Sequence, residues 1–183
     1  MMVTRSLAIL LVAASTGACN ERVDPVAPRG EPTIIEVSSA MAPARIAATG
    51  TFTQTGITSL EVSSAGPNTI IEQTSVGLIS GTLSGPYQDD LRVLIRPDGS
   101  FTAHFTITCE CTVDGKQGTV EMVAQDHGQL ISPTVGEFAG KAVIKGATGG
   151  LTGLRGLLAI EGTVDVPSGL STYDYSGSIR PRP

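Results

Sequence analysis

The chain has 183 residues, of which 40% are hydrophobic and 16% are charged. This balance excludes a highly charged disordered chain and predicts one folded domain of ordinary size. With 17 acidic and 12 basic residues the formal net charge is -5, so a nucleic acid partner is not expected. The 22 glycines and 11 prolines are typical of a protein rich in β-strands and turns.

The first residues are typical of an export signal. Arg5 precedes an apolar run, Leu7 to Ala14, which is too short to span a bilayer. Small residues then end at Cys19, and Gly-Ala-Cys resembles the end of a bacterial lipobox, where a peptidase cuts before a cysteine that carries lipid. Thr16 departs from this motif, which usually has leucine there, so an ordinary secretory signal is the alternative. We predict a signal peptide over 1–18 and a protein of the cell envelope, lipid-anchored to a bacterial membrane.

Residues 19–43 are predicted to hold the lipid anchor site and a flexible tether. Four of the 11 prolines fall between residues 20 and 43, with several charges among them. Only Thr33 to Val37 has strand character in this segment. The folded domain is therefore predicted to span 44–180.

Within that domain, polar and apolar residues alternate with a period of two, which predicts β-strands. The predicted strands lie near Ile46–Gln54, Thr58–Ser63, Thr69–Leu83, 91–96, 101–111, 120–124, 138–145, 158–165 and 173–180. In the clearest of them, Phe101 to Cys111, apolar residues and cysteines lie on one face and polar residues on the other. Asp98-Gly99 and Asp114-Gly115 flank this strand and predict two hairpins.

No helical period follows the signal, so a sheet with one apolar face has no helix to cover it. The remaining choices are a two-sheet sandwich and a closed barrel. Because the connections have hairpin length, we predict an all-β fold, an antiparallel up-and-down barrel of about eight strands.

A glycine-rich run, Lys145 to Gly156, continues into the strand Leu157 to Val164, and Thr172-Tyr173-Asp174-Tyr175 follows. Together with Ala48 to Phe52, these residues resemble the allene oxide cyclase barrel-like superfamily, most closely a bacterial branch described as a domain of unknown function. The resemblance implies an eight-stranded barrel whose interior holds an apolar ligand. It implies no catalytic residues, because no catalytic motif of the superfamily's enzymes matches this chain.

No cofactor and no metal site are predicted. The glycine run lacks the GxGxxG order and no helix follows it, so it predicts a tight turn and not a phosphate-binding loop. His104 is predicted on the face opposite the cysteines and His127 at a turn, which leaves a metal ion without a third ligand.

Cys109 and Cys111 are predicted to be two buried thiols. Residues two apart in an ideal strand lie about 6.5 to 7 Å apart, and a disulfide needs about 3.5 to 4.5 Å between its Cβ atoms. A bond between them is therefore expected to break the strand. A redox-active pair and a metal site are the alternatives.

The candidate ligand-binding residues are those on the apolar faces that carry rings, sulfur or a polar handle. They are Tyr173, Tyr175, Phe105, Phe138 and Met122, together with Glu72. Glu72 and Gln73 are neighbours on opposite faces of one strand, and the periodicity leaves open which of them faces the interior.

Small residues such as Ala103, Ala124 and Ala142 fall on the same apolar faces and leave either a filled barrel or a ligand cavity. We therefore predict a protein that binds a small apolar molecule in its interior. The alternatives are a cyclase or isomerase for a lipid-like or polyketide-like substrate and a structural envelope lipoprotein. A cavity with a single inward carboxylate or a tyrosine pair would favour the enzyme, an apolar cavity the binding protein, and a filled barrel the structural role. The oligomeric state stays open between monomer and trimer.

The lipid anchor predicts the result of one substitution. Expressed with its signal in a Gram-negative host, the protein should fractionate with membranes, and Cys19→Ala should release or misprocess it, because no other residue can receive the lipid there. Fractionation followed by mass measurement of the mature chain tests this. Identical soluble products from the parent and the variant would contradict the anchor.

Overall fold

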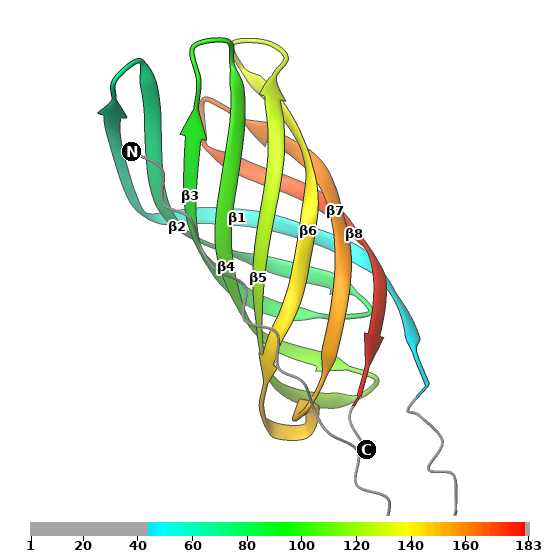
Figure 1. Cartoon of the computed structure of the whole chain (residues 1–183). Coiled ribbons are helices and arrows are strands. Elements are labelled where there is room, and N and C mark those ends of the chain that lie inside the picture. Colours follow the sequence, from blue (N-terminus) through cyan, green and yellow to red (C-terminus); the bar gives the residue numbers. More distant parts are fainter. Residues whose placement is uncertain (1–43, 182–183) are drawn as a thin grey trace, which may run out of the picture. The chain divides into compact units, whose positions relative to one another are not determined.

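The computed structural model describes residues 44–181, and in this part of the chain eight strands form one closed barrel (Figure 1). The strands are β1 (Ile46–Ala65), β2 (Asn68–Gly81), β3 (Gly85–Ile95), β4 (Ser100–Val113), β5 (Lys116–Leu130), β6 (Val135–Ala147), β7 (Arg155–Asp165) and β8 (Leu170–Arg180). Each strand pairs antiparallel with the next, and β8 pairs with β1. The predicted all-β up-and-down barrel is confirmed.

Helix is confined, in the described residues, to the short 3-10 helix η1 (Gly149–Leu151) within the glycine-rich turn. No helix in residues 44–181 is long and apolar enough to cross a bilayer. The predicted signal peptide, Cys19 and the tether lie outside the described residues.

The first strand differs from its prediction. β1 is one strand of 20 residues, whereas the sequence predicted separate strands at Ile46–Gln54 and Thr58–Ser63. Its pairing with β2 shifts between Gln54 and Gly56 and again between Ile57 and Ser59. Such β-bulges bend a strand and reverse its alternation while hydrogen bonding continues, so the broken period in the sequence is a bend and not a turn.

The two hairpins predicted on either side of β4 are confirmed. Ser100 to Val113 pairs with β3 on one side and β5 on the other. Gly99 and Gly115 have φ angles of 80° and 72°, in the left-handed region that tight turns require.

Three aromatic rings pack over glycines of neighbouring strands inside the barrel. A Cβ atom added to any of these glycines would collide with the ring opposite, so the missing side chain is what makes room. The pairs are Gly50 with Tyr175, Gly77 with Tyr87, and Gly128 with Phe101. These contacts fix where the three rings lie against the opposite strands.

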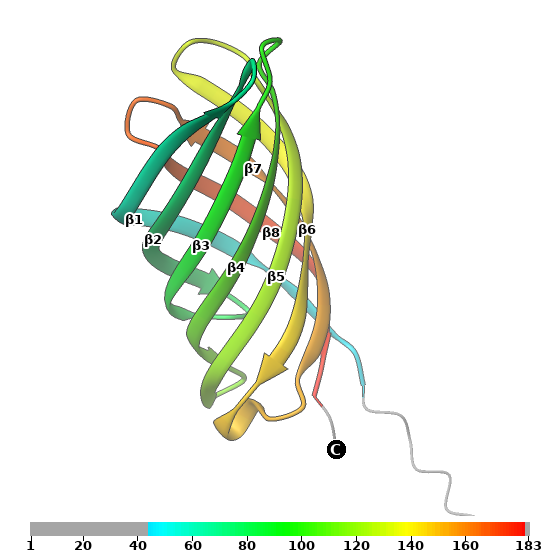
Figure 2. The same cartoon turned by 60° about the vertical axis from the view of Figure 1, so that its left-hand side comes forward.

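The two ends of the barrel differ. The β1–β2, β3–β4, β5–β6 and β7–β8 hairpins gather at one end, here called the hairpin end, and the remaining connections lie at the other (Figures 1 and 2). At that other end, Leu83, Leu151 and Leu154 are all buried and fill the interior. The Leu83 backbone N–H donates to the hydroxyl of Tyr175 at 2.9 Å, which ties the β2–β3 connection to the core.

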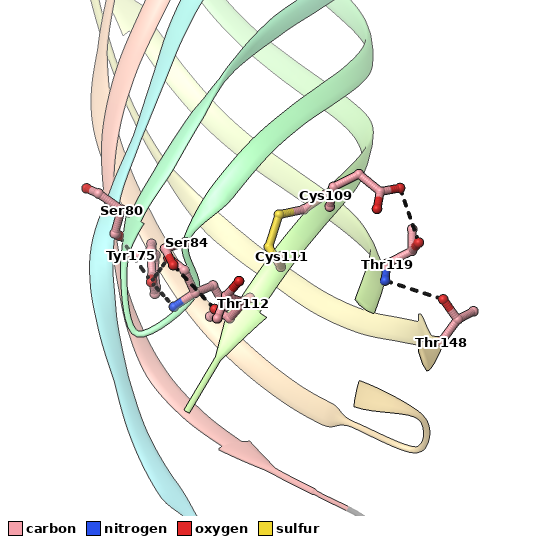
Figure 3. The surroundings of a disulfide bond; sticks show 10 residues. Ser80, Ser84, Cys109, Cys111, Thr112, Thr119, Thr148 and Tyr175 are labelled. Atoms are coloured by element: carbon pink, nitrogen blue, oxygen red, sulfur yellow. Dashed lines mark hydrogen bonds between the residues drawn. A yellow bond between two sulfur atoms is a disulfide. The ribbon is translucent and has the colours of Figure 1, made fainter. Parts of the chain in front are cut away.

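Cys109 and Cys111 form a disulfide in this filled half, which corrects the prediction of two separate thiols (Figure 3). The strand is not broken, because β4 runs continuously from Ser100 to Val113. The prediction assumed ideal strand spacing, but the two Cα atoms are only 5.2 Å apart. Local contraction of β4 brings the sulfur atoms together while both cysteines stay buried.

Candidate functional site

A cavity of about 120 Å³ lies inside the barrel at the hairpin end and is partly open to the outside. Most of its wall is apolar and comes from Ile71, Leu91, Val93, Ile95, Phe101, Ala103, Phe105, Leu130, Phe138, Val164 and Val166. Its polar lining comes from Gln54, Gln73, Asp89, Asp126, Ser171 and Tyr173. The site therefore combines an apolar chamber with two buried carboxyl groups.

Asp89, on β3, is held by hydrogen bonds from two other strands. Gln54 donates from Nε2 to Asp89 Oδ2 at 2.9 Å, and the Ser75 hydroxyl donates to Asp89 Oδ1. Gln54 is fixed in turn, because it accepts the Ser171 N–H at 2.8 Å. Burial raises the pKa of Asp89, and the bonds from Ser75 and Gln54 oppose that rise. This carboxyl group has its partners within the fold.

Asp126, on β5, differs from Asp89 because one of its carboxyl oxygen atoms has no hydrogen-bond partner. Its side chain is buried, with 4% exposed, and its Oδ1 atom has no hydrogen-bond partner. Burial raises the pKa of Asp126 to about 7, and a hydrogen bond from the Ala103 backbone acts in the other direction. A Cβ atom at Gly140, its partner on β6, would collide with the Asp126 backbone, so the glycine lets the two strands approach closely there. Asp126 therefore lines the cavity, has one buried oxygen atom without a partner, and changes charge near neutral pH.

Tyr173 is the polar group among the aromatic side chains of the site. Its ring stacks on Phe52 with centroids 4.8 Å apart and meets Phe105 and Phe138 edge-on at 6.3 and 5.7 Å. The hydroxyl groups of Tyr173 and the neighbouring Tyr87 are buried with no partner that satisfies hydrogen-bond geometry. Burial raises the pKa of both phenols, and they stay protonated donors at neutral pH.

The structure brings three of the predicted ligand-binding residues together at the cavity: Tyr173, Phe105 and Phe138. Tyr175 and Met122 are fully buried in the same core but do not line the cavity. The hydroxyl of Tyr175 instead accepts the Leu83 N–H.

Glu72 lies on the outer face, and this corrects its place among the predicted interior residues. Its carboxylate pairs with Arg92 Nε at 3.2 Å, and 55% of its side chain is exposed. Gln73 is the neighbour that faces inward, because its register on β2 places it on the same face as Ser75. Its Nε2 donates to the Gly169 carbonyl at 3.4 Å, at the β7–β8 turn.

Sequence reasoning missed Gln54, Asp89 and Asp126. The signal that identifies them is the same alternation continued two residues further: Phe52 to Gln54, Leu91 back to Asp89, and Ala124 to Asp126. Each of these polar residues lies at the end of a series of apolar residues. The simpler interpretation of such a residue is that the strand becomes exposed to solvent there. Within residues 44–181, no three His, Cys, Asp or Glu side chains come together in a way that could hold a metal ion.

The arrangement supplies one carboxyl group that titrates near pH 7 and phenol donors beside an apolar space. A carboxylate in such a position accepts a proton or a hydrogen bond from a bound molecule, and a buried phenol donates to its oxygen. The site is therefore suited to binding and to proton transfer.

No model of a known protein family matches the chain, and no curated protein matches it. Among solved structures the chain is similar to two pterocarpan synthase dirigent proteins. The first has 13% sequence identity and a TM-score of 0.48, over 85% of this chain and 98% of that one. The second has 15% sequence identity and a TM-score of 0.47, over 76% of this chain and 97% of that one. The resemblance to the allene oxide cyclase barrel-like superfamily and its bacterial branch stays a prediction.

The pKa of Asp126 predicts how one substitution changes stability with pH. An unfolded aspartate titrates at about 3.9, and folded Asp126 at about 7. Between these values the unfolded state has lost the proton and the folded state keeps it, so the free energy of unfolding falls as pH rises from about 4 to about 7. Asp126→Asn removes this loss and should stabilise the protein at pH 8 by a few kcal/mol, at roughly 1.4 kcal/mol per pKa unit.

Urea unfolding at pH 4 and pH 8 measures this effect. Asp114→Asn is the matched control, because Asp114 is exposed at a turn with a φ of 50° that asparagine also adopts. An equal effect of Asp126→Asn at both pH values would contradict the assigned titration.

Proposed function

We propose that the barrel binds a small, largely apolar molecule in the cavity at its hairpin end. The observation that carries the proposal is an apolar chamber lined in part by Asp126, a carboxyl group with one oxygen atom that has no hydrogen-bond partner. A barrel with only a structural role has no need of such a chamber. Export and anchoring through Cys19 belong to the same proposal and place the binding site in the cell envelope.

The size and lining of the cavity support this proposal. Its volume is about 120 Å³, close to that of engineered apolar cavities of roughly 150 Å³ that stay dry and bind benzene. A ring or a short chain therefore fits inside, and a longer ligand extends through the opening. Asp126 and Tyr173 would fix a polar group of the ligand, as the few polar groups of small-molecule sites do.

Toluene is a probe of this site, and Ala103→Leu is the variant that tests it. Ala103 lines the cavity and is 3% exposed, so a leucine there fills space that the probe needs. We expect toluene to bind the parent with a Kd of about 1 mM or tighter, equal to about 4 kcal/mol, and the variant at least tenfold more weakly. Methyl NMR of Ile71, Leu91 and Val93 follows the titration.

Ala159→Leu is the matched control, because Ala159 is exposed on the outside of β7. It should bind toluene as the parent does. Methyl shifts that never saturate, or equal affinity in the parent and Ala103→Leu, would refute interior binding.

A second candidate function is proton-transfer catalysis, as in a cyclase or isomerase. The unpartnered Oδ1 of Asp126 and its pKa of about 7 favour it, because a general base works best when its pKa lies near the operating pH. The phenol of Tyr173 lines the same cavity and would stabilise a developing oxyanion. In this candidate Asp126 removes a proton from carbon next to a carbonyl group and returns it to the product.

Cyclohexanone tests this chemistry without knowledge of the natural substrate. In D₂O the carboxylate of Asp126 would take an α-proton, exchange it with solvent and return a deuteron, so the protein should speed deuteration at least tenfold over buffer. The rate should rise as pH increases through about 7, because the base must be ionised. NMR of the ketone measures it.

Asp126→Asn should lose this exchange, and Asp114→Asn should keep it. Proton transfer by Asp126 would be rejected if both variants exchange deuterium as fast as the parent, or if the parent is no faster than buffer. Neither result affects the test of toluene binding.

A further inference from the structure

The cavity has acidic side chains in its wall and no basic ones among the residues described. Asp89 and Asp126 line it, and the other lining residues are apolar or neutral and polar. The buried polar residues of the barrel are likewise Gln54, Gln73, Ser75, Asp89 and Asp126, without a lysine, arginine or histidine. A ligand that enters therefore meets carboxyl groups with no cation to balance them.

We infer that the cavity selects a cationic apolar ligand, an alkyl- or arylalkylamine bound as its ammonium ion with the nitrogen at Asp126. This inference rests on the proposed binding function and specifies the class of ligand. It separates the site from one for fatty acids, whose carboxylate would lie against two acidic side chains.

The two carboxyl groups have different roles in this selection. Asp89 already accepts hydrogen bonds from Gln54 and Ser75, so its oxygen atoms are occupied. Asp126 has a free oxygen atom, and a buried unpaired polar atom is costly until a donor reaches it. An ammonium group supplies both the donor and the opposite charge, and a charge-assisted hydrogen bond is stronger than a neutral one.

The aromatic side chains around the site favour a cation as well. Tyr173, Phe105 and Phe138 line the cavity and pack against one another. The face of an aromatic ring carries negative potential and attracts an ammonium group within about 6 Å. A carboxylate receives no such stabilisation from these rings.

The apolar part of the ligand follows the chamber toward the hairpin end. Ile71, Val93 and Val164 belong to the apolar wall of the cavity, which is partly open to the outside. With its nitrogen at Asp126, a straight alkyl chain would lie along this wall and emerge at the opening. Burial of each CH₂ group contributes roughly 0.8 kcal/mol, so chain length should raise affinity without changing the preference for charge.

Binding of an amine should depend on pH through Asp126. From β3 and β8, Asp89 and Tyr173 are the titratable groups that face the same space, and the paired strands β4 and β6 contribute Ala103, Phe105 and Phe138. With a pKa of about 7, Asp126 is mostly protonated at pH 6 and ionised at pH 8. An alkylammonium ion stays charged at both, so its affinity should be about tenfold higher at pH 8.

Octylamine, 1-octanol and octanoate test the inference, because they share one chain and differ in charge. Each is titrated into the full protein at pH 8 in 150 mM salt, which screens binding to surface carboxylates. We expect octylamine to bind at least tenfold more tightly than octanol, and octanoate at least tenfold more weakly. Calorimetry gives the affinities, and competition with toluene places each ligand in the cavity.

Asp126→Asn keeps the size of the side chain and removes its charge. It should lower the affinity for octylamine to within about threefold of octanol and leave octanol binding intact, which also shows that the variant is folded. Asp114→Asn, on the surface, should behave as the parent.

Each outcome decides between the two proposals. Equal affinities for the three ligands, tightest binding of octanoate, or an amine preference that survives Asp126→Asn would overturn selection of a cation while interior binding stands. If none of the three binds saturably and none competes with bound toluene, the inference is overturned while interior binding stands. If toluene itself does not bind saturably, the proposed binding function is overturned as well.

Discussion

Closure of the barrel by its first and last strands is the constraint on which the rest of the structure depends. Ile46 to Thr53 of β1 pair with Thr172 to Ile179 of β8, so this half of the sheet has no free edge. Beyond Thr53, β1 pairs only with β2, and two bulges bend it away. The cavity lies where the closing pairs end. The length over which β1 pairs with β8 therefore determines both the filled core and the open chamber.

The distribution of side-chain size follows from this closure. In the closed half, rings occupy the space above glycines, as Tyr175 does at Gly50, and leucines seal the end. Near the opening, small residues stand beside rings: Ala103 lies two residues from Phe105 on β4, and Gly140 two residues from Phe138 on β6. The packing of rings on glycines fixes the wall of the cavity. The small residues beside the rings leave the space inside that wall unfilled.

The alternation of residues predicted the strands and the barrel because one face of every strand is buried, and a period of two records that directly. The same rule failed where burial and polarity disagree. Asp89 and Asp126 are carboxyl residues at positions that the alternation places inward, but their charge suggests the end of the buried series. The register with neighbouring strands shows that they are enclosed. Next to Glu72 and Gln73 the strand has apolar residues on both faces, Ile70 and Ile71. The alternation therefore could not predict which of the two polar side chains faces the interior. The Cys109–Cys111 bond depends on a contraction of the backbone that ideal spacing does not represent.

The contrast between the two inward carboxyl groups links the fold to its chemistry. The cost of burying Asp89 is offset within the structure, because its carboxyl group accepts hydrogen bonds from side chains of β1 and β2. Asp126 has no such compensation at Oδ1, and its burial lowers stability increasingly as pH rises from about 4, with the full loss reached above about 7. An asparagine or a leucine would serve a purely structural interior better. The sequence satisfies the local rules of a barrel almost everywhere, and Asp126 is the inward carboxyl group that departs from them without compensation. Its place beside an apolar cavity is what the proposed binding of a ligand would explain.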